Sequence, residues 1–339
     1  MVDQLPSAVE FGSLSHISDC MLRLKHSLEV ILTVIPKGSR IALLDEPVHR
    51  NIGDHLIHLG IERFFRTHDM EIIARAHTFS YRRPWLGRRI SRDTVIACNG
   101  GGHLGDLYPG HQQLRERVVT DFPGHRVVVL PQSIYFKDNR PMRQAAALFG
   151  QHPDFHLFLR DRDSMQQAEA MGLGKLYLAP DMAHALYPID ISNRAAAAQG
   201  KVLYLLRRDM EDTAAPEAST IDESPCDWPD LVRHRDTLVL ATLAAGFALF
   251  QGIGPPQLLN ALLDQRRAIL VERGIELLAR YDEIVTSRLH GALLGLLLGR
   301  KVQLLASLTG KSHAYYRTWL TDHPRCEYLP AILDKDAHG

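Results

Sequence analysis

The sequence predicts an α/β protein made of two Rossmann-like domains that face each other across a cleft. Short apolar segments of strand length alternate with helix-length amphipathic segments along most of the chain, a pattern typical of parallel sheets covered by helices. The 339 residues are more than one hydrophobic core supports comfortably, so we expect two domains, residues 1–190 and 191–339. Polar residues follow several of the apolar segments, where open α/β sheets bind their ligands.

The first domain is expected to begin with an amphipathic helix over residues 14–35, because apolar residues recur there at helical spacing. Packing on the first domain would explain this helix, and docking on a membrane or a partner is the alternative. After it, the pattern predicts strands over 40–45, 71–74, 94–98, 126–130, 155–159 and 176–178, and helices over 55–65, 114–119 and 164–171.

The second domain repeats the alternation with longer helices. We expect strands over 201–206, 283–286 and 301–305, helices over 231–251, 255–280 and 315–320, and a loop over 210–230. The longest apolar run, Leu238–Phe250, is too short to cross a bilayer as a helix. It predicts a buried helix, with a membrane-surface helix as the alternative.

Composition argues against several classes of protein. Lysine plus arginine and aspartate plus glutamate number 39 each, so no general attraction to nucleic acid is expected. The four cysteines form no CxxC pair and the 18 histidines no HExxH motif, so we expect neither disulfides nor a metal site. The first residues lack the pattern of a signal peptide, which predicts a cytoplasmic protein.

The segment from Ser287 to Gly291 predicts an anion site. It stands where a short strand gives way to a helix, and helix N-termini present unpaired N–H groups and a positive dipole end. Arg288 adds a forked donor suited to phosphate or carboxylate, and His290 adds a group that transfers protons near neutral pH. We therefore expect an anionic substrate that is protonated during the reaction.

Other candidate residues also follow predicted strands. Arg160 and Arg207 each end a strand, and Lys311 follows a later one, so these cations could gather beside Arg288. As isolated residues they would more often form surface ion pairs. Asp54, near the start of a helix, is explained equally well as a cap, a contact to a sugar hydroxyl or a general base.

Between about residue 40 and residue 320, several motifs resemble those of the polysaccharide pyruvyl transferase family in type and in order. The most specific is Ser287-Arg288-Leu289-His290-Gly291, and the least specific is the glycine run. The others are Asn51-x-Gly53-Asp54, Gly100-Gly101-Gly102, Pro131-Gln132-Ser133, Arg160-Asp161-x-x-Ser164, Pro180-Asp181, Arg207-Arg208-Asp209 and Gly310-Lys311.

The resemblance implies a GT-B-like fold and transfer of pyruvate from phosphoenolpyruvate to a sugar as a cyclic ketal, with no metal or cofactor. His290 is expected to be the general acid and Asp54 a weaker candidate for the base. The implied acceptor is an undecaprenyl-linked oligosaccharide, and the implied enzyme is bacterial and acts in the cytoplasm or on the inner face of the membrane. The oligomeric state stays open. Donor-binding residues would be Arg160, Arg207, Arg288, Leu289 and Lys311, and acceptor-binding residues Asn51, Gly101, Gly102, His103 and Gln132.

Two other functions are compatible with the sequence. A glycosyltransferase that uses a nucleotide sugar would share the fold and the cleft, so the fold alone does not exclude it. A non-catalytic, partner-binding relative would be expected to lack Arg288 or His290, and both are present.

Overall fold

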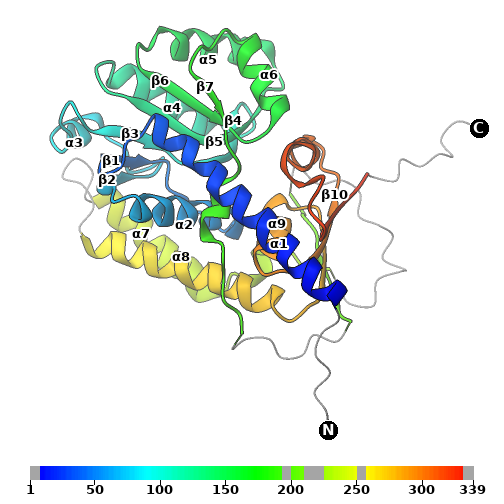
Figure 1. Ribbon diagram of the computed structural model, residues 1–339. Helices are drawn as coiled ribbons and strands as arrows, with labels where there is room; N and C mark the ends of the chain where they lie inside the picture. The colour runs from blue at the N-terminus through cyan, green and yellow to red at the C-terminus, as the bar shows by residue number, and fades with distance from the viewer. Residues whose placement is uncertain (1–7, 193–199, 210–224, 250–256, 331–339) are drawn as a thin grey trace, which may run out of the picture.

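The computed structural model of the protein describes residues 8–192, 200–209, 225–249 and 257–330, and its strands form two parallel sheets (Figure 1). The larger sheet has the order β2-β1-β3-β5-β6-β7, with β4 beside β5, and the smaller has the order β11-β10-β9-β8. The strands are β1 (Arg40–Leu44), β2 (Glu71–Ala76), β3 (Val95–Cys98), β4 (Gly101–Gly105), β5 (Val127–Tyr135), β6 (Phe155–Leu159), β7 (Leu176–Leu178), β8 (Val202–Leu205), β9 (Glu283–Thr286), β10 (Lys301–Leu305) and β11 (Cys326–Leu329).

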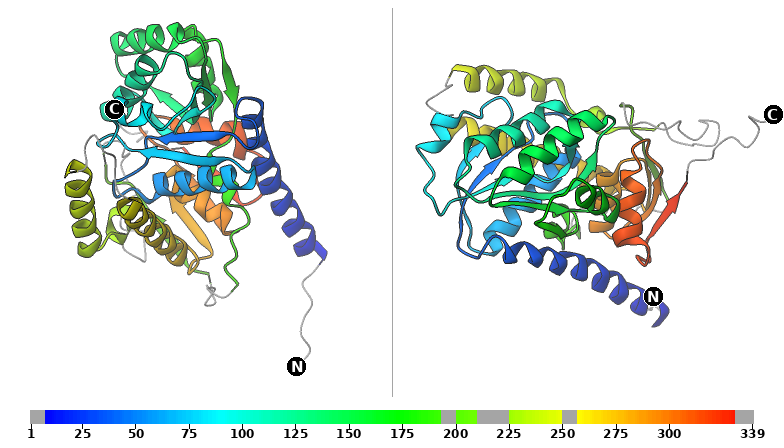
Figure 2. Two further views of the ribbon diagram at one scale, coloured as in Figure 1. Left: turned by 90° about the vertical axis from the view of Figure 1, so that its left-hand side faces the viewer. Right: turned by 90° about the horizontal axis from the view of Figure 1, so that it is seen from above.

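Helices surround both sheets, as the views in Figure 2 show. The α-helices are α1 (Ala8–Ser27), α2 (Ile52–Thr67), α3 (Arg83–Gly87), α4 (Pro109–Asp121), α5 (Asn139–Gln151), α6 (Arg162–Ala170), α7 (His234–Leu249), α8 (Gln257–Leu278), α9 (Leu289–Leu297) and α10 (Lys311–Tyr315). Shorter helical turns are η1 (Leu28–Thr33), η2 (Met182–Leu186), η4 (Trp228–Leu231) and η5 (Tyr316–Leu320). The α/β class is confirmed. The predicted division at residue 190 stays a prediction, although the strands change sheets between β7 and β8.

The central strands of the larger sheet are buried on both faces, and most of their positions are apolar. Successive residues of a strand point to opposite faces. Ile41 and Leu43 of β1 accordingly pack with α2 and η1, whereas Ala42 and Leu44 pack with α4 and α5 on the other side. This double cover explains the continuous apolar runs by which the strands were predicted.

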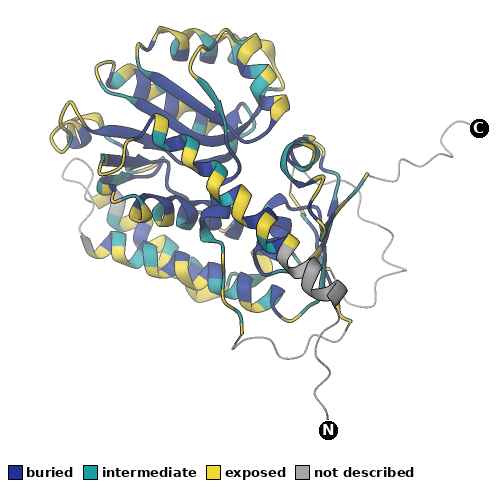
Figure 3. Cartoon of the chain, viewed as in Figure 1, coloured by how far each residue is buried: buried dark blue, intermediate teal, exposed yellow. Residues whose placement is uncertain are grey.

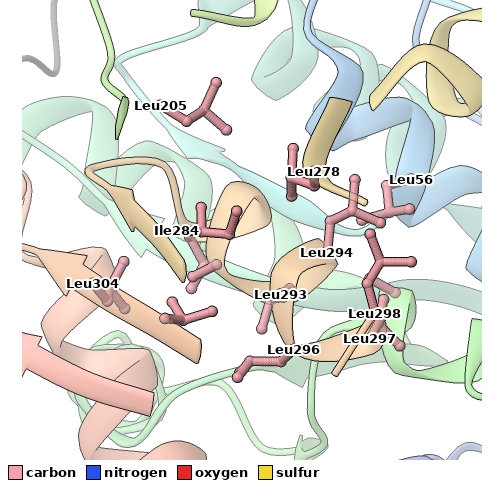
Figure 4. Packing of buried hydrophobic residues seen from close by; sticks show 14 of the residues in the cluster. Leu56, Leu205, Leu278, Ile284, Leu293, Leu294, Leu296, Leu297, Leu298 and Leu304 are labelled. Atoms are coloured by element: carbon pink, nitrogen blue, oxygen red, sulfur yellow. The ribbon is translucent and has the colours of Figure 1, made fainter. Parts of the chain in front are cut away.

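A third apolar cluster joins the two halves of the chain. Leucines of α9 and strands of the smaller sheet pack against Leu56 of α2 and Leu278 of α8 (Figure 4). Met21 and Leu24 of α1 belong to the same cluster. The expectation that α1 packs on the first domain was therefore incomplete, because these two buried residues also join the core of the smaller sheet. Buried and exposed residues alternate along the described part of α1 (Figure 3).

Two elements differ from the sequence pattern. Gly101–Gly105, which includes part of the glycine run, forms β4 beside β5, a strand that the pattern did not predict. Helix α7 is not buried as expected: Leu238 is 56% exposed and Leu249 is 78% exposed. In the loop predicted over 210–230, residues 210–224 lie outside the described part, and Trp228–Leu231 form η4. Among the described helices, none has the length and apolarity that a membrane span requires.

Candidate functional site

A cavity lies where the carboxyl ends of strands from both sheets meet. Ten of the twelve predicted site residues line it: Asn51, Asp54, Gly102, His103, Arg160, Arg207, Arg288, Leu289, His290 and Lys311. The other residues along its wall are Tyr108, Trp228, Ser307 and Ser312. The cavity therefore lies where parallel sheets usually bind ligands, at the carboxyl ends of their strands. Its residues are up to 260 positions apart in the sequence, from Asn51 to Lys311.

Asp181 connects the two sides of this cavity. Its Oδ2 accepts a hydrogen bond from Arg160 Nη1 at 2.7 Å and another from His290 Nε2 at 3.1 Å. Burial raises the pKa of this fully buried carboxyl, but His290 and Arg160 outweigh that effect and hold the pKa below its ordinary value. Asp181 is therefore an anion that orients a cation and an imidazole toward each other.

Arg160 is held rigidly where it leaves β6. Its Nε donates to Ser133 Oγ at 2.8 Å, and its carbonyl accepts from Trp319 Nε1 at 2.8 Å. Its Nη1 lies 3.5 Å from His290 Nε2. Because the guanidinium is buried and fixed from several directions, it can present its remaining N–H groups to an anion at little cost in side-chain entropy.

His290 lies in the first turn of α9, directly against the first turn of α2. A Cβ on Gly53 would lie 2.7 Å from His290 Cβ and 2.9 Å from its Nδ1, so only glycine allows this approach. Since a carboxylate accepts only, Nε2 carries the proton that bonds to Asp181. Nδ1 is then the nitrogen left for a second proton, and a side chain at position 53 would crowd it.

Lys311 reaches the same cavity from the other sheet. It begins α10, after Gly310 in a left-handed conformation (φ 68°), and its Nζ donates to the Gly102 carbonyl at 3.0 Å. A side chain at position 102 would meet Arg160 Nη2 at 3.1 Å and the Lys311 side chain at 3.6 Å. Gly102 therefore allows both cations to approach the backbone of β4.

Arg288 and Arg207 form a second cation group on the smaller sheet. Arg288, the residue that precedes α9, pairs through its fork with Asp227 and donates to Asp209 at 3.1 Å. Arg207 Nε donates to the other oxygen of Asp209 at 2.9 Å. The two aspartates neutralise the positive charges of the arginines. A bound anion would therefore compete with Asp209 for the N–H donors of Arg207 and Arg288.

Asn51 and Asp54 lie at the start of α2. The Asn51 side chain caps the helix by accepting from Gly53 N at 3.0 Å, and its amide donates to Asp54 Oδ2 at 2.7 Å. Burial raises the pKa of Asp54, but His103 and His49 lower it well below its ordinary value. A carboxylate with a lowered pKa is a weaker base, which favours binding of a hydroxyl over proton abstraction.

Gly101 and Gln132 are the two predicted residues that do not line the cavity. Gln132 is fully buried; its Oε1 accepts from the His103 backbone N at 3.1 Å and its Nε2 donates to the Asn99 carbonyl at 2.8 Å. Gly101 is buried in β4 with φ 129°, a conformation that favours glycine. Gln132 thus holds the backbone of His103, and Gly101 leaves room for its ring.

Sequence reasoning gave no role to Asp181, Asp209 or Asp227. The first two were visible in the Pro180-Asp181 and Arg207-Arg208-Asp209 segments, each at the end of a strand. Buried arginines require carboxylate partners, so these two aspartates could have been predicted to pair with the strand-end arginines. Tyr108, Trp228, Ser307 and Ser312 stand in no motif that would have marked them.

The chain is similar in sequence to several known proteins. The family model of polysaccharide pyruvyl transferase matches residues 51–306. The chain is 32% identical to "Putative pyruvyl transferase EpsO" of Bacillus subtilis (strain 168), over 93% of this chain and 96% of that protein. It is also 32% identical to "Pyruvyl transferase 1" of Schizosaccharomyces pombe, over 83% of this chain and 70% of that protein.

One solved structure has a similar fold. An uncharacterized protein of Klebsiella pneumoniae subsp. pneumoniae NTUH-K2044 superimposes with a TM-score of 0.56, covering 90% of this chain and 98% of that chain. The two sequences are 19% identical, so this likeness concerns the fold alone.

Proposed function

Because the chain belongs to the polysaccharide pyruvyl transferase family, we propose that it transfers pyruvate from phosphoenolpyruvate to a sugar of a lipid-linked oligosaccharide. The product is a cyclic pyruvate ketal, and inorganic phosphate is released. The observation that carries the proposal is the contact of Asp181 with both Arg160 and His290 in a cavity that also contains Arg288 and Lys311.

The donor carries a carboxylate and a phosphate, so it requires several cations in one place. Arg160 and Lys311 approach each other at Gly102, and Arg288 and Arg207 follow strands of the smaller sheet. We assign the two charged groups of the donor to these two pairs. The start of α9 adds unpaired N–H groups, with Leu289 as the first helical residue.

In the reaction, His290 donates a proton from Nδ1 to the methylene carbon C3, which becomes a methyl group and leaves oxocarbenium character at C2. A sugar hydroxyl attacks C2, its proton passes through the general base to His290 and restores the proton that was given to C3, and phosphate then leaves. A second hydroxyl of the sugar closes the ring at C2, and its proton departs with the phosphate. Asp181 holds Nε2–H and stabilises the imidazolium from which the proton is transferred.

The acceptor is assigned to the side of the cavity formed by Asn51, Asp54 and His103. A second cavity, of about 620 Å³, opens from these residues toward His49, His111 and Asp227. A space of this size accommodates a sugar residue beside the donor. Asp54 then binds an acceptor hydroxyl, and we leave the identity of the general base open.

A lipid-linked acceptor places the reaction at the cytoplasmic face of the membrane. Most described apolar side chains of α1, such as Met21 and Leu24, are buried, and Leu22 is the one exposed leucine in the described part of this helix. Leu238, Val239 and Leu249 of α7 are exposed, and we assign the contact to them. Co-sedimentation with anionic vesicles tests this: Leu238→Asp with Leu249→Asp should abolish binding, and equal sedimentation of the double variant would exclude α7.

The proposed activity is tested by incubating the enzyme with a panel of lipid-linked oligosaccharides and either phosphoenolpyruvate or nucleotide sugars. We expect phosphate release and a product whose mass has increased by one pyruvate ketal, only with phosphoenolpyruvate. A product that has gained a sugar from UDP-sugars would instead identify a glycosyltransferase. Absence of any product, with no binding of phosphoenolpyruvate, would favour a non-catalytic relative.

A further inference from the structure

Three histidines that are far apart in the sequence meet at the edge of the acceptor-side cavity. His49 follows β1, His103 lies in β4 and His111 lies in α4. One ring nitrogen of each lies within 4.8 Å of those of the other two, and all three side chains are half-buried. The rings of His103 and His111 stack with centroids 4.5 Å apart. No motif in the sequence marks this cluster.

The orientation of His111 is fixed from outside the cluster. Asp45 Oδ1 lies 2.6 Å from His111 Nδ1, which therefore carries the proton. Asp45 is itself buried and held by Arg115 at 2.7 Å. A carboxylate that holds the proton of one ring nitrogen leaves the other with a lone pair, which is the usual arrangement behind metal-binding histidines.

Asp54 supplies an oxygen to the same cluster. Its Oδ2 lies 3.3 Å from His49 Nε2 and 3.5 Å from His103 Nε2. Ligand atoms around a tetrahedral Zn²⁺ with bonds of about 2.0–2.1 Å stand about 3.3–3.4 Å apart. Asp54 is thus already at about ligand spacing from His49 and from His103, whereas the ring nitrogens of the three histidines lie within 4.8 Å of one another and would move closer around an ion.

From these contacts we propose that His49, His103, His111 and Asp54 bind a divalent transition-metal ion such as Zn²⁺. Three imidazoles with one carboxylate select Zn²⁺, Co²⁺ or Ni²⁺ over Mg²⁺ and Ca²⁺, which prefer oxygen ligands. Binding requires His49 to give up the 3.3 Å hydrogen bond that its Nδ1 accepts from Asn51 N. An ion here would lie beside the acceptor cavity, where it could accept a hydroxyl or phosphate oxygen as a further ligand.

The proposal goes beyond the pyruvyl transfer and differs from the metal-free site that the family resemblance implies. The competing explanation is that two imidazole N–H groups share Asp54 without any ion. That arrangement would also give the observed distances, but it predicts no affinity for a metal. The two explanations are separated by measuring metal binding without donor or acceptor, so the outcome does not depend on the proposed activity.

Isothermal titration of the untagged, chelator-treated full chain with ZnCl₂, and with MgCl₂ as a comparison, tests the proposal. We expect one equivalent of Zn²⁺ to bind and no Mg²⁺. With CoCl₂ the protein should show the visible absorption of four-coordinate cobalt. His111→Asn should abolish binding, and Asp45→Asn should weaken it by about 10–100-fold while leaving the ligands in place.

His234→Asn is the matched control, because His234 is an exposed histidine on α7, outside the cluster. It should bind Zn²⁺ like the wild type. Circular dichroism would verify that each variant is folded. No saturable Zn²⁺ binding by the wild type, or equal affinity in the wild type, His111→Asn and Asp45→Asn proteins, would overturn the metal site.

Discussion

Arg75 and Arg160 both lie toward the carboxyl ends of strands in the larger sheet, and both pair with buried carboxylates, yet their surroundings differ. Arg75, in β2, pairs with Glu46, with Glu62 at 2.9 Å and with Asp264 of α8 at 2.8 Å. Arg160, after β6, pairs with Asp181 and contacts His290. The Arg75 group connects α8 to the sheet, whereas the Arg160 group lines the cavity.

The difference shows that the residues around a strand-end arginine decide whether its guanidinium is enclosed by other side chains or faces a cavity. Arg267, fully buried on α8, lies within 3.7 Å of Glu46 and Glu62 and closes the Arg75 group. Gly102 faces Arg160 instead, and the imidazole of His290 shares the carboxylate of Asp181. The first group therefore stabilises packing between the two halves, and the second can receive a charged substrate.

The largest expected effect is that of His290→Ala, which removes the proposed acid. Turnover should fall by about 10²–10⁴-fold, the usual contribution of general acid catalysis. Binding of phosphoenolpyruvate, measured by calorimetry, should persist because the arginines and Lys311 remain. Near-normal turnover in this variant would remove His290 from the mechanism.

Arg75→Met should affect stability and leave the site intact. Removing one partner of a buried ion-pair group costs about 3–5 kcal/mol, because the remaining charges lose their compensation. Urea unfolding should show this loss, while KM for phosphoenolpyruvate in the folded fraction stays unchanged. A raised KM with unchanged stability would show that Arg75 contributes to the site and not to packing.

Arg160→Lys should give the converse result. The positive charge remains beside Asp181, but the fork that reaches Ser133 and the cavity is lost. Charged hydrogen bonds contribute about 1.5–3 kcal/mol each, so kcat/KM should fall by about 10–100-fold. The unfolding midpoint in urea serves as the control and should change much less than in Arg75→Met.

The smallest effect concerns acid stability. His184, behind the Arg160 group, has its Nε2 2.8 Å from Tyr315 Oη, and burial lowers its pKa to about 4. The unfolded state binds a proton near pH 6.5, so stability falls as the pH drops from 6.5 toward 4. By pH 5.5 this group should cost about 1.4 kcal/mol. His184→Asn should flatten the pH dependence by that amount, and an unchanged slope would contradict it.

Much of the fold could be predicted from the sequence because it depends on local patterns. Apolar runs of strand length, such as Val127–Leu130, predicted strands that the structure contains. The segment at Arg288 marks a helix start, and α9 does begin at Leu289. The strand β4 was missed because glycines carry no apolar pattern, and its hydrogen bonds are made with β5, about thirty residues further along.

The site, too, has features that the sequence predicts and features that depend on tertiary structure. The sequence alone determined that Arg160, Arg207, Arg288 and Lys311 follow strands, since strand ends are read from periodicity. Only the tertiary structure decided that Asp181 joins Arg160 to His290 and that His49, His103 and His111 converge. These contacts depend on strand order and on the close approach of α2 to α9 at Gly53, which no local pattern encodes.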